Sequence, residues 1–160
     1  MSTSGSGLDV LLDLQARGPG AVGVAGLLDM GIESVERGRV RFTLRTQPAF
    51  SNPHGTLHGG ITATLLDSAM GCAVLSTLPP GVGYTTVDLS VTYLRPVPTD
   101  GRALRAEGDV VHVGRTIATT RGEVRDDRDR VIATAVTTCV ISPPSTSRAA
   151  PEARSEEDAA

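Results

Sequence analysis

One carboxylate stands alone in a long apolar stretch of this chain. From Gly59 to Leu78 the only charged side chain is that of Asp67. An ionised carboxylate is costly to bury, because it loses its hydration. The ordinary explanation is structural: a backbone group or an arginine can satisfy a buried Asp, and such networks also perturb carboxylates. In a cleft, however, the same group could serve as a general base.

A second chemical feature, the sequence His58-Gly59-Gly60, lies where this apolar stretch is predicted to begin a helix. The N–H groups of a first helical turn lack intrahelical acceptors and carry the positive end of the helix dipole. Because glycine has no Cβ, a ligand carbonyl could approach these N–H groups closely, as in an oxyanion hole. The alternative is plain turn chemistry, since glycine is common where a loop meets a helix.

The spacing of the two features predicts a dimer. Gly60 and Asp67 are seven residues apart, which is about 10 Å along a helix. A general base and an oxyanion donor must both lie about 3 Å from one reacting group. Two antiparallel copies of the helix would align the Gly60 of each chain with the Asp67 of the other. We therefore expect a two-fold dimer with composite sites.

The elements that position these residues follow from hydrophobic periodicity. A short amphipathic helix is expected over Leu8–Arg17, and the long apolar helix begins at Gly59. Alternating patterns predict strands at Leu28–Val35, Arg39–Thr46, Tyr84–Leu94, Ala103–Val113, Thr116–Arg125 and Val131–Ile141. Short connections predict that the last four strands form an antiparallel meander. The fold class is α+β, with about six antiparallel strands wrapped around one long helix.

Composition predicts one globular domain of a cytoplasmic protein. The chain has 160 residues, and we expect a single domain over residues 8–142 between disordered segments at residues 1–7 and 143–160. The net charge of −3 argues against a nucleic-acid surface. Asp67 and the glycines favour a buried helix over a membrane span, and no secretory signal is recognisable. Cys72 and Cys139 lie in apolar surroundings and are interpreted as reduced core residues.

Metal binding and serine hydrolase chemistry are disfavoured. His54 and His58 are four residues apart, but Gly55 lies between them, and His112 is the only other histidine. Zinc sites usually need three or four ligands, so no metal is expected. The sequence contains no G-x-S-x-G nucleophile motif.

The segments NPHGTLHGGITATLLD and TTVDLSVTYLRPVPTDG resemble the hotdog-fold acyl-CoA thioesterases of the PaaI type, which are relatives of 4-hydroxybenzoyl-CoA thioesterase. The resemblance covers about Phe50–Ile141. It implies a hotdog fold and hydrolysis of an acyl-CoA, with an aryl or a short- or medium-chain acyl group, without a cofactor. It also implies a homodimer that pairs again into a homotetramer.

The resemblance assigns roles to matching residues. Asp67 would be the catalytic carboxylate, as nucleophile or as general base on water, and the Gly60 N–H would polarise the thioester carbonyl. Asn52 and His58 would position the substrate and the helix start. Thr86 stands where the family often has a serine that holds the lytic water. The substrate- and CoA-binding candidates are Gly59, Arg95, Val113, Gly114, Arg115 and Thr116.

Several alternatives stay open at this point. Arg95 could be a phosphate ligand or a surface charge at a strand end, and Asp88 could simply satisfy a turn. The protein could act on acyl groups held by an acyl carrier protein. It could also be a non-catalytic acyl-CoA-binding protein with the same fold, although no output domain is recognisable in the sequence.

Overall fold

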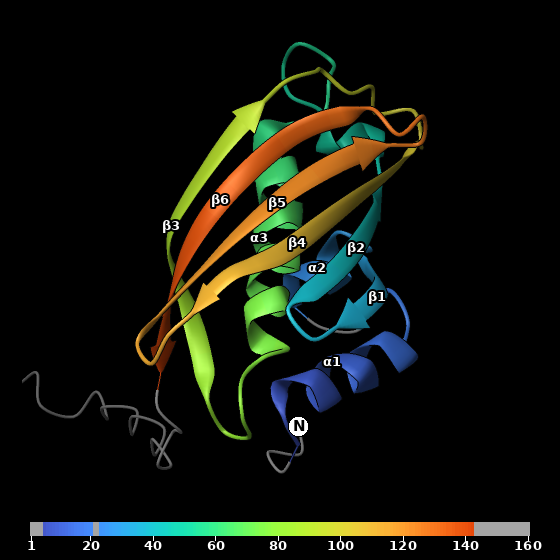
Figure 1. Cartoon of the computed structure of the whole chain (residues 1–160). Helices are drawn as coiled ribbons and strands as arrows, with labels where there is room; N and C mark the ends of the chain where they lie inside the picture. Colours follow the sequence, from blue (N-terminus) through green and yellow to red (C-terminus); the bar gives the residue numbers. More distant parts are fainter. Residues whose placement is uncertain (1–4, 21–22, 143–160) are drawn as a thin grey trace, which may run out of the picture.

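The computed structural model describes residues 5–20 and 23–142, which form an antiparallel sheet wrapped around one long helix (Figure 1). This confirms the predicted α+β architecture. In chain order the elements are α1 (Gly7–Ala16), α2 (Gly23–Leu27), β1 (Gly31–Glu36), β2 (Arg39–Arg45), a 3-10 turn (Pro48–Phe50), α3 (Gly59–Leu75), β3 (Gly83–Tyr93), β4 (Ala103–Val113), β5 (Ile117–Asp126) and β6 (Val131–Ser142).

The N-terminal region differs in detail from the expectation. The helix α2 was not predicted, because five residues are too few for a helical period, and β1 begins three residues later than expected. Ser6 and Gly7 were expected in a disordered segment, but Ser6 caps α1 and the Gly7 N–H donates to the Leu78 carbonyl at 3.0 Å. Residues 1–4 and the predicted tail, residues 143–160, lie outside the described residues.

The strand order corrects the predicted meander. It is β1-β2-β4-β5-β6-β3, so that β4, β5 and β6 form a meander but β3 pairs with β6. The physical reason is the connection at residues 94–102, which is too long for a tight hairpin. It runs across the start of α3 instead: the Leu57 N–H donates to the Val97 carbonyl at 2.8 Å, and Val97 is buried.

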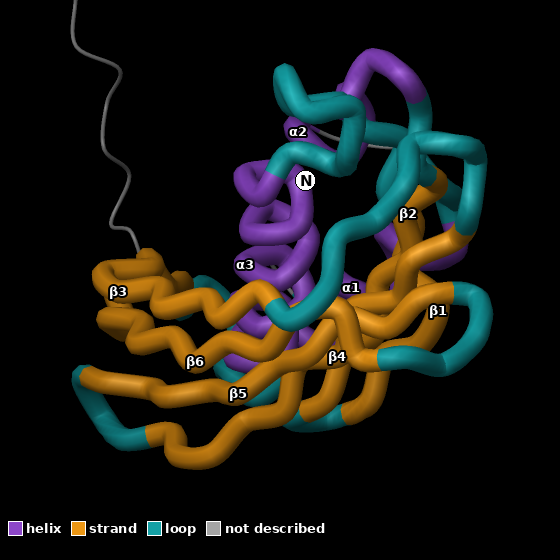
Figure 2. Tube along the Cα trace, turned by 90° about the horizontal axis from the view of Figure 1, so that it is seen from above, coloured by secondary structure: helices purple, strands orange, loops and turns teal. Residues whose placement is uncertain are grey.

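Small residues let α3 approach the sheet. Gly108 of β4 and Gly122 of β5 are directly paired across the strands. A Cβ on Gly108 would lie 2.6 Å from Met70 Cα, and one on Gly122 would lie 2.9 Å from Met70 Sδ. The fully buried Leu65, Leu66 and Met70 fill the space between helix and sheet. Figure 2 shows the resulting layers, with the helices on one side of the curved sheet.

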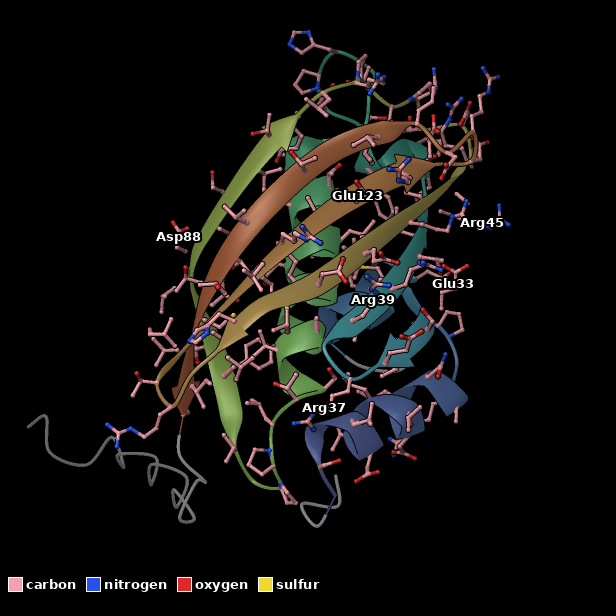
Figure 3. The ribbon with its side chains drawn as sticks, in the orientation of Figure 1. Glu33, Arg37, Arg39, Arg45, Asp88 and Glu123 are labelled. Carbon is pink, nitrogen blue, oxygen red and sulfur yellow. The ribbon has the colours of Figure 1, made fainter. Side chains whose placement is uncertain are left out.

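The sheet face away from α3 carries the polar half of the alternating pattern. Arg39 of β2 donates to Asp109 of β4 at 2.6 Å, and Figure 3 shows Arg39 and Glu123 on this outer face. Acids and arginines alternate here, so the face has no basic excess. Among the described residues, no helix is long and apolar enough to cross a bilayer.

Candidate active site

A β-bulge in β3 aims Thr86 at Asp67. The pairing of β3 with β6 shifts register between Thr86 and Asp88, which leaves Val87 and Asp88 both exposed. Thr86 and Leu89, three residues apart, can then both face α3. The Thr86 hydroxyl donates to Asp67 Oδ1 at 2.9 Å. The structure thus brings together two of the predicted site residues.

Asp67 and Thr86 share a cavity of about 250 Å³ with an otherwise mainly apolar wall. Burial and the charge of Asp67 raise the pKa of the neighbouring Cys72 thiol to about 12. Burial also raises the pKa of the Tyr84 hydroxyl. Both groups therefore stay protonated at neutral pH, and Asp67 is the only carboxyl residue among those that line this cavity. The lining residues are Leu14, Gly18, Val24, Ala25, Met30, Ile32, Phe42, Asp67, Ser68, Cys72, Tyr84 and Thr86.

The structure adds detail to what the sequence indicated about the two cysteines and Tyr84. Cys72 and Cys139 are both free, and Cys139 is buried with its sulfur 3.9 Å from the Thr86 hydroxyl. Tyr84 was not singled out in the sequence as a site residue. The sequence feature that relates to Tyr84 is Gly71, which lies on the Asp67 face of the helix. A Cβ at Gly71 would lie 2.4 Å from the Tyr84 hydroxyl, so the glycine leaves room for the tyrosine.

The start of α3 changes the choice of backbone donor. His58 is the N-cap, and its Nδ1 accepts the Gly60 N–H at 2.9 Å, so the N–H that we predicted as the oxyanion donor already has a partner. The Ile61 N–H donates to the His58 carbonyl at 3.0 Å. Within the described part of the chain, the Gly59 N–H has no acceptor. Gly59 therefore offers the free donor.

A second cavity, of about 300 Å³, adjoins this helix start. Asn52 lies in its wall and organises the loop, because its Oδ1 accepts the His54 N–H at 2.9 Å and the Thr56 N–H at 3.2 Å. Tyr93 donates its hydroxyl proton to the Gly59 carbonyl at 2.9 Å. The lining residues are Asn52, Leu57, Gly59, Thr62, Tyr93, Leu94, Arg95, Pro96, Val97 and Ile132.

The two cavities are separate within one chain. They share no lining residue, and Gly59 and Asp67 are eight residues apart on α3, about 12 Å along its axis. One chain therefore presents a carboxylate and a free N–H at two different places.

The two candidate phosphate-binding arginines also lie at different places in one chain. Arg95 is exposed at the helix-start cavity and donates to the Val131 carbonyl. Arg115 is exposed in the turn between β4 and β5. In this turn the Gly114 N–H donates to the Ile117 carbonyl at 2.8 Å, so Arg115 and Thr116 are the two central residues and Val113 is the last residue of β4. The turn lies beside the start of β3, because Ile141 pairs with Tyr84 and its N–H donates to the Thr116 carbonyl.

The remaining polar candidates line neither cavity. Asp88 is exposed and points away from the sheet (Figure 3). The His58 imidazole is engaged in the helix cap. Across residues 5–20 and 23–142, no three His, Cys, Asp or Glu side chains gather in a way that could hold a metal ion.

Comparisons with known proteins agree with this geometry. A family model described as the thioesterase superfamily matches residues 54–133, half of the chain. A protein of Halobacterium salinarum is 39% identical over 59% of this chain and 64% of its own length. Human acyl-coenzyme A thioesterase 13 is 36% identical over 54% of this chain, and the match spans 61% of that enzyme. The matches thus span less than two thirds of these two relatives.

A solved structure confirms the fold. The Escherichia coli PaaI protein from the phenylacetic acid degradation operon superposes with a TM-score of 0.76. The superposition covers 86% of this chain and 95% of PaaI, at 20% sequence identity. The predicted hotdog fold is confirmed.

Proposed function

Because the chain belongs to the thioesterase superfamily, we propose that it hydrolyses the thioester bond of an acyl-CoA to a carboxylic acid and free coenzyme A. The observation that carries this proposal is the Asp67 carboxylate, held by the Thr86 hydroxyl in an apolar cavity. The relative named as an acyl-coenzyme A thioesterase supports coenzyme A as the carrier.

Asp67 acts as the general base. Thr86 occupies Oδ1, so the other oxygen takes a proton from a water molecule whose oxygen attacks the thioester carbonyl carbon. The new C–O bond places negative charge on the carbonyl oxygen, where a Gly59 N–H stabilises it. Collapse of this intermediate breaks the C–S bond, and the proton held by Asp67 passes to the departing thiolate.

The working unit is a dimer with shared sites. The separation of the two cavities supports a site in which the Asp67 of one chain works with the Gly59 N–H of its partner. The eleven-residue strand β3 lies at the edge of the sheet, and long strand edges are normally paired or covered. Pairing along β3 aligns the two copies of α3 in opposite directions. Arg95, which follows the end of β3, and Arg115, which follows the end of β4, then flank one site and bind coenzyme A phosphates. The dimer pairs again into a tetramer.

The acyl group lies in the cavity beside Asp67. Its wall is formed by aliphatic, aromatic and sulfur-containing side chains apart from the groups near the carboxylate. Its volume of about 250 Å³ suits an aryl or a medium-chain acyl group rather than a long chain.

Thiol release from a panel of acyl-CoA substrates tests the function. The panel contains phenylacetyl-, benzoyl-, hexanoyl- and palmitoyl-CoA, with one acyl group also carried by an acyl carrier protein. Asp67→Asn should lower kcat by about 10²–10⁴-fold, the usual contribution of a general base, and leave the melting temperature nearly unchanged. Asp88→Asn is the matched control, because Asp88 is an exposed aspartate on β3. Near-full activity of Asp67→Asn on the best substrate would refute the assignment.

A further inference from the structure

The peptide group between Gly59 and Gly60 is held from both sides. Its carbonyl accepts the Tyr93 hydroxyl proton at 2.9 Å, and its N–H donates to His58 Nδ1 at 2.9 Å. The preceding peptide is held through the His58 carbonyl, which accepts the Ile61 N–H at 3.0 Å. The Gly59 N–H belongs to the His58–Gly59 peptide and is the free donor of these two fixed peptide groups within the described residues.

Two successive glycines would otherwise make a poorly defined donor. Glycine has more backbone freedom than any other residue, so a Gly-Gly pair at a helix start has no intrinsic preference for one orientation. A side chain at Gly59 cannot supply that preference, because its Cβ would lie 3.1 Å from Tyr93 Cζ and 3.2 Å from the Tyr93 oxygen. The Tyr93 ring thus occupies the space that a side chain at position 59 would need.

We propose that Tyr93 is a positioning residue for the oxyanion donor. Its hydroxyl fixes the peptide that follows the Gly59 N–H, so that this N–H points at the developing oxyanion without reorganising. The assignment rests on the proposed thioesterase function.

Tyr93 lies on the same strand, β3, as the residue that contacts Asp67. The same strand carries Thr86, which holds Asp67, and Tyr93, which holds Gly59. Strand β3 therefore positions two groups of α3, the Asp67 carboxylate and the Gly59 backbone. Tyr93 also lies in the wall of the helix-start cavity with 52% of its surface exposed, so its hydroxyl can be removed without opening the core.

The decisive variant is Tyr93→Phe, which keeps the ring and removes only the hydroxyl. We expect kcat on the best acyl-CoA to fall about tenfold, because small displacements of a positioned group are costly in the transition state. The Kd for a non-hydrolysable acyl-CoA thioether should change less than twofold, because the thioether has no carbonyl oxygen to receive the N–H. Thr92→Val is the matched control, since it removes a hydroxyl from the neighbouring residue on the outer face. It should retain wild-type kcat.

A double-mutant cycle tests whether Tyr93 acts through Gly59. Gly59→Ala should itself lower kcat, and adding Tyr93→Phe to it should then cost less than twofold. Fully multiplicative effects would overturn the proposal, as would a Tyr93→Phe kcat within twofold of wild type. An equal loss of thioether affinity would show that Tyr93 contributes ordinary binding instead.

A spectroscopic measurement keeps this result separate from the proposed function. In ¹⁵N-labelled protein, Tyr93→Phe should move the Gly59 and Gly60 amide resonances and speed their hydrogen exchange, whereas Thr92→Val should not. Unmoved resonances would overturn the positioning role even in an active enzyme. Moved resonances in a protein that hydrolyses no thioester would support the contact and refute the thioesterase function.

Discussion

Subunit mixing tests the shared site with two variants that damage different halves of it. Asp67→Asn removes the base, and Gly59→Val obstructs the free N–H. In Gly59→Val the added Cβ would lie 3.1 Å from Tyr93 Cζ, so the ring must shift by a few tenths of an ångström, and the valine methyl groups add further bulk beside the N–H. Each variant alone should be nearly inactive, because every site in its homodimer lacks one of the two groups.

The expected recovery follows from the geometry. Asp67 and Gly59 are eight residues apart on one helix, about 12 Å, so in the proposed dimer each site would take one group from each chain. A heterodimer then has one site with both defects and one with neither. Random exchange at equal concentrations makes about half of the dimers heterodimers, and about a quarter of wild-type activity per chain should return.

The assay is thiol release after the two variants have been mixed, partly dissociated in mild denaturant and returned to buffer. Each variant treated alone is the control for refolding artefacts. A mixture of Asp67→Asn with Asp67→Ala should recover nothing, because both carry the same defect. The Asp67→Asn and Gly59→Val mixture could also recover no activity although mass spectrometry detects heterodimers. In that case each chain contains a complete site, and the composite arrangement is refuted.

Two further predictions concern stability. Gly108→Ala should lower the free energy of unfolding by about 2–3 kcal/mol, because its Cβ would lie 2.6 Å from the backbone at Met70 and overpacking costs this much. Gly83→Ala, where no atom lies within 4 Å, should cost little in the same urea titration. Burial alone would raise the pKa of the Asp126 carboxyl, but hydrogen bonds from the Arg130 side chain and from backbone N–H groups lower it to about 2. This pKa lies below the unfolded value of 3.8, so about 2 kcal/mol of stability should be present above pH 4 and lost as the pH falls towards 2. In a plot of the free energy of unfolding against pH, Asp126→Asn should flatten the acid limb. An unchanged limb would contradict the assignment.

The sequence predicted the features that depend on neighbouring residues. The alternation in RVRFTLR and ALRAEGDVVHV placed β2 and β4 to within one residue, because a strand exposes its two faces in turn. His58-Gly59-Gly60 marked the start of α3, because helix ends require caps. The lone charge at Asp67 was visible for the same reason: one helical stretch contains both the charge and the apolar residues around it.

The tertiary structure decided which of these elements meet. Nothing in the local sequence of β3 states that it pairs with β6 rather than β4, since that choice depends on a nine-residue connection and on the packing of α3. The bulge that turns Thr86 towards Asp67 exists only relative to β6. The identity of the free N–H depended on the His58 side chain, whose Nδ1 takes the proton of Gly60 and leaves that of Gly59. Residue spacing limits the possible distances along one helix, but hydrogen-bond partners are fixed only when distant segments pack together.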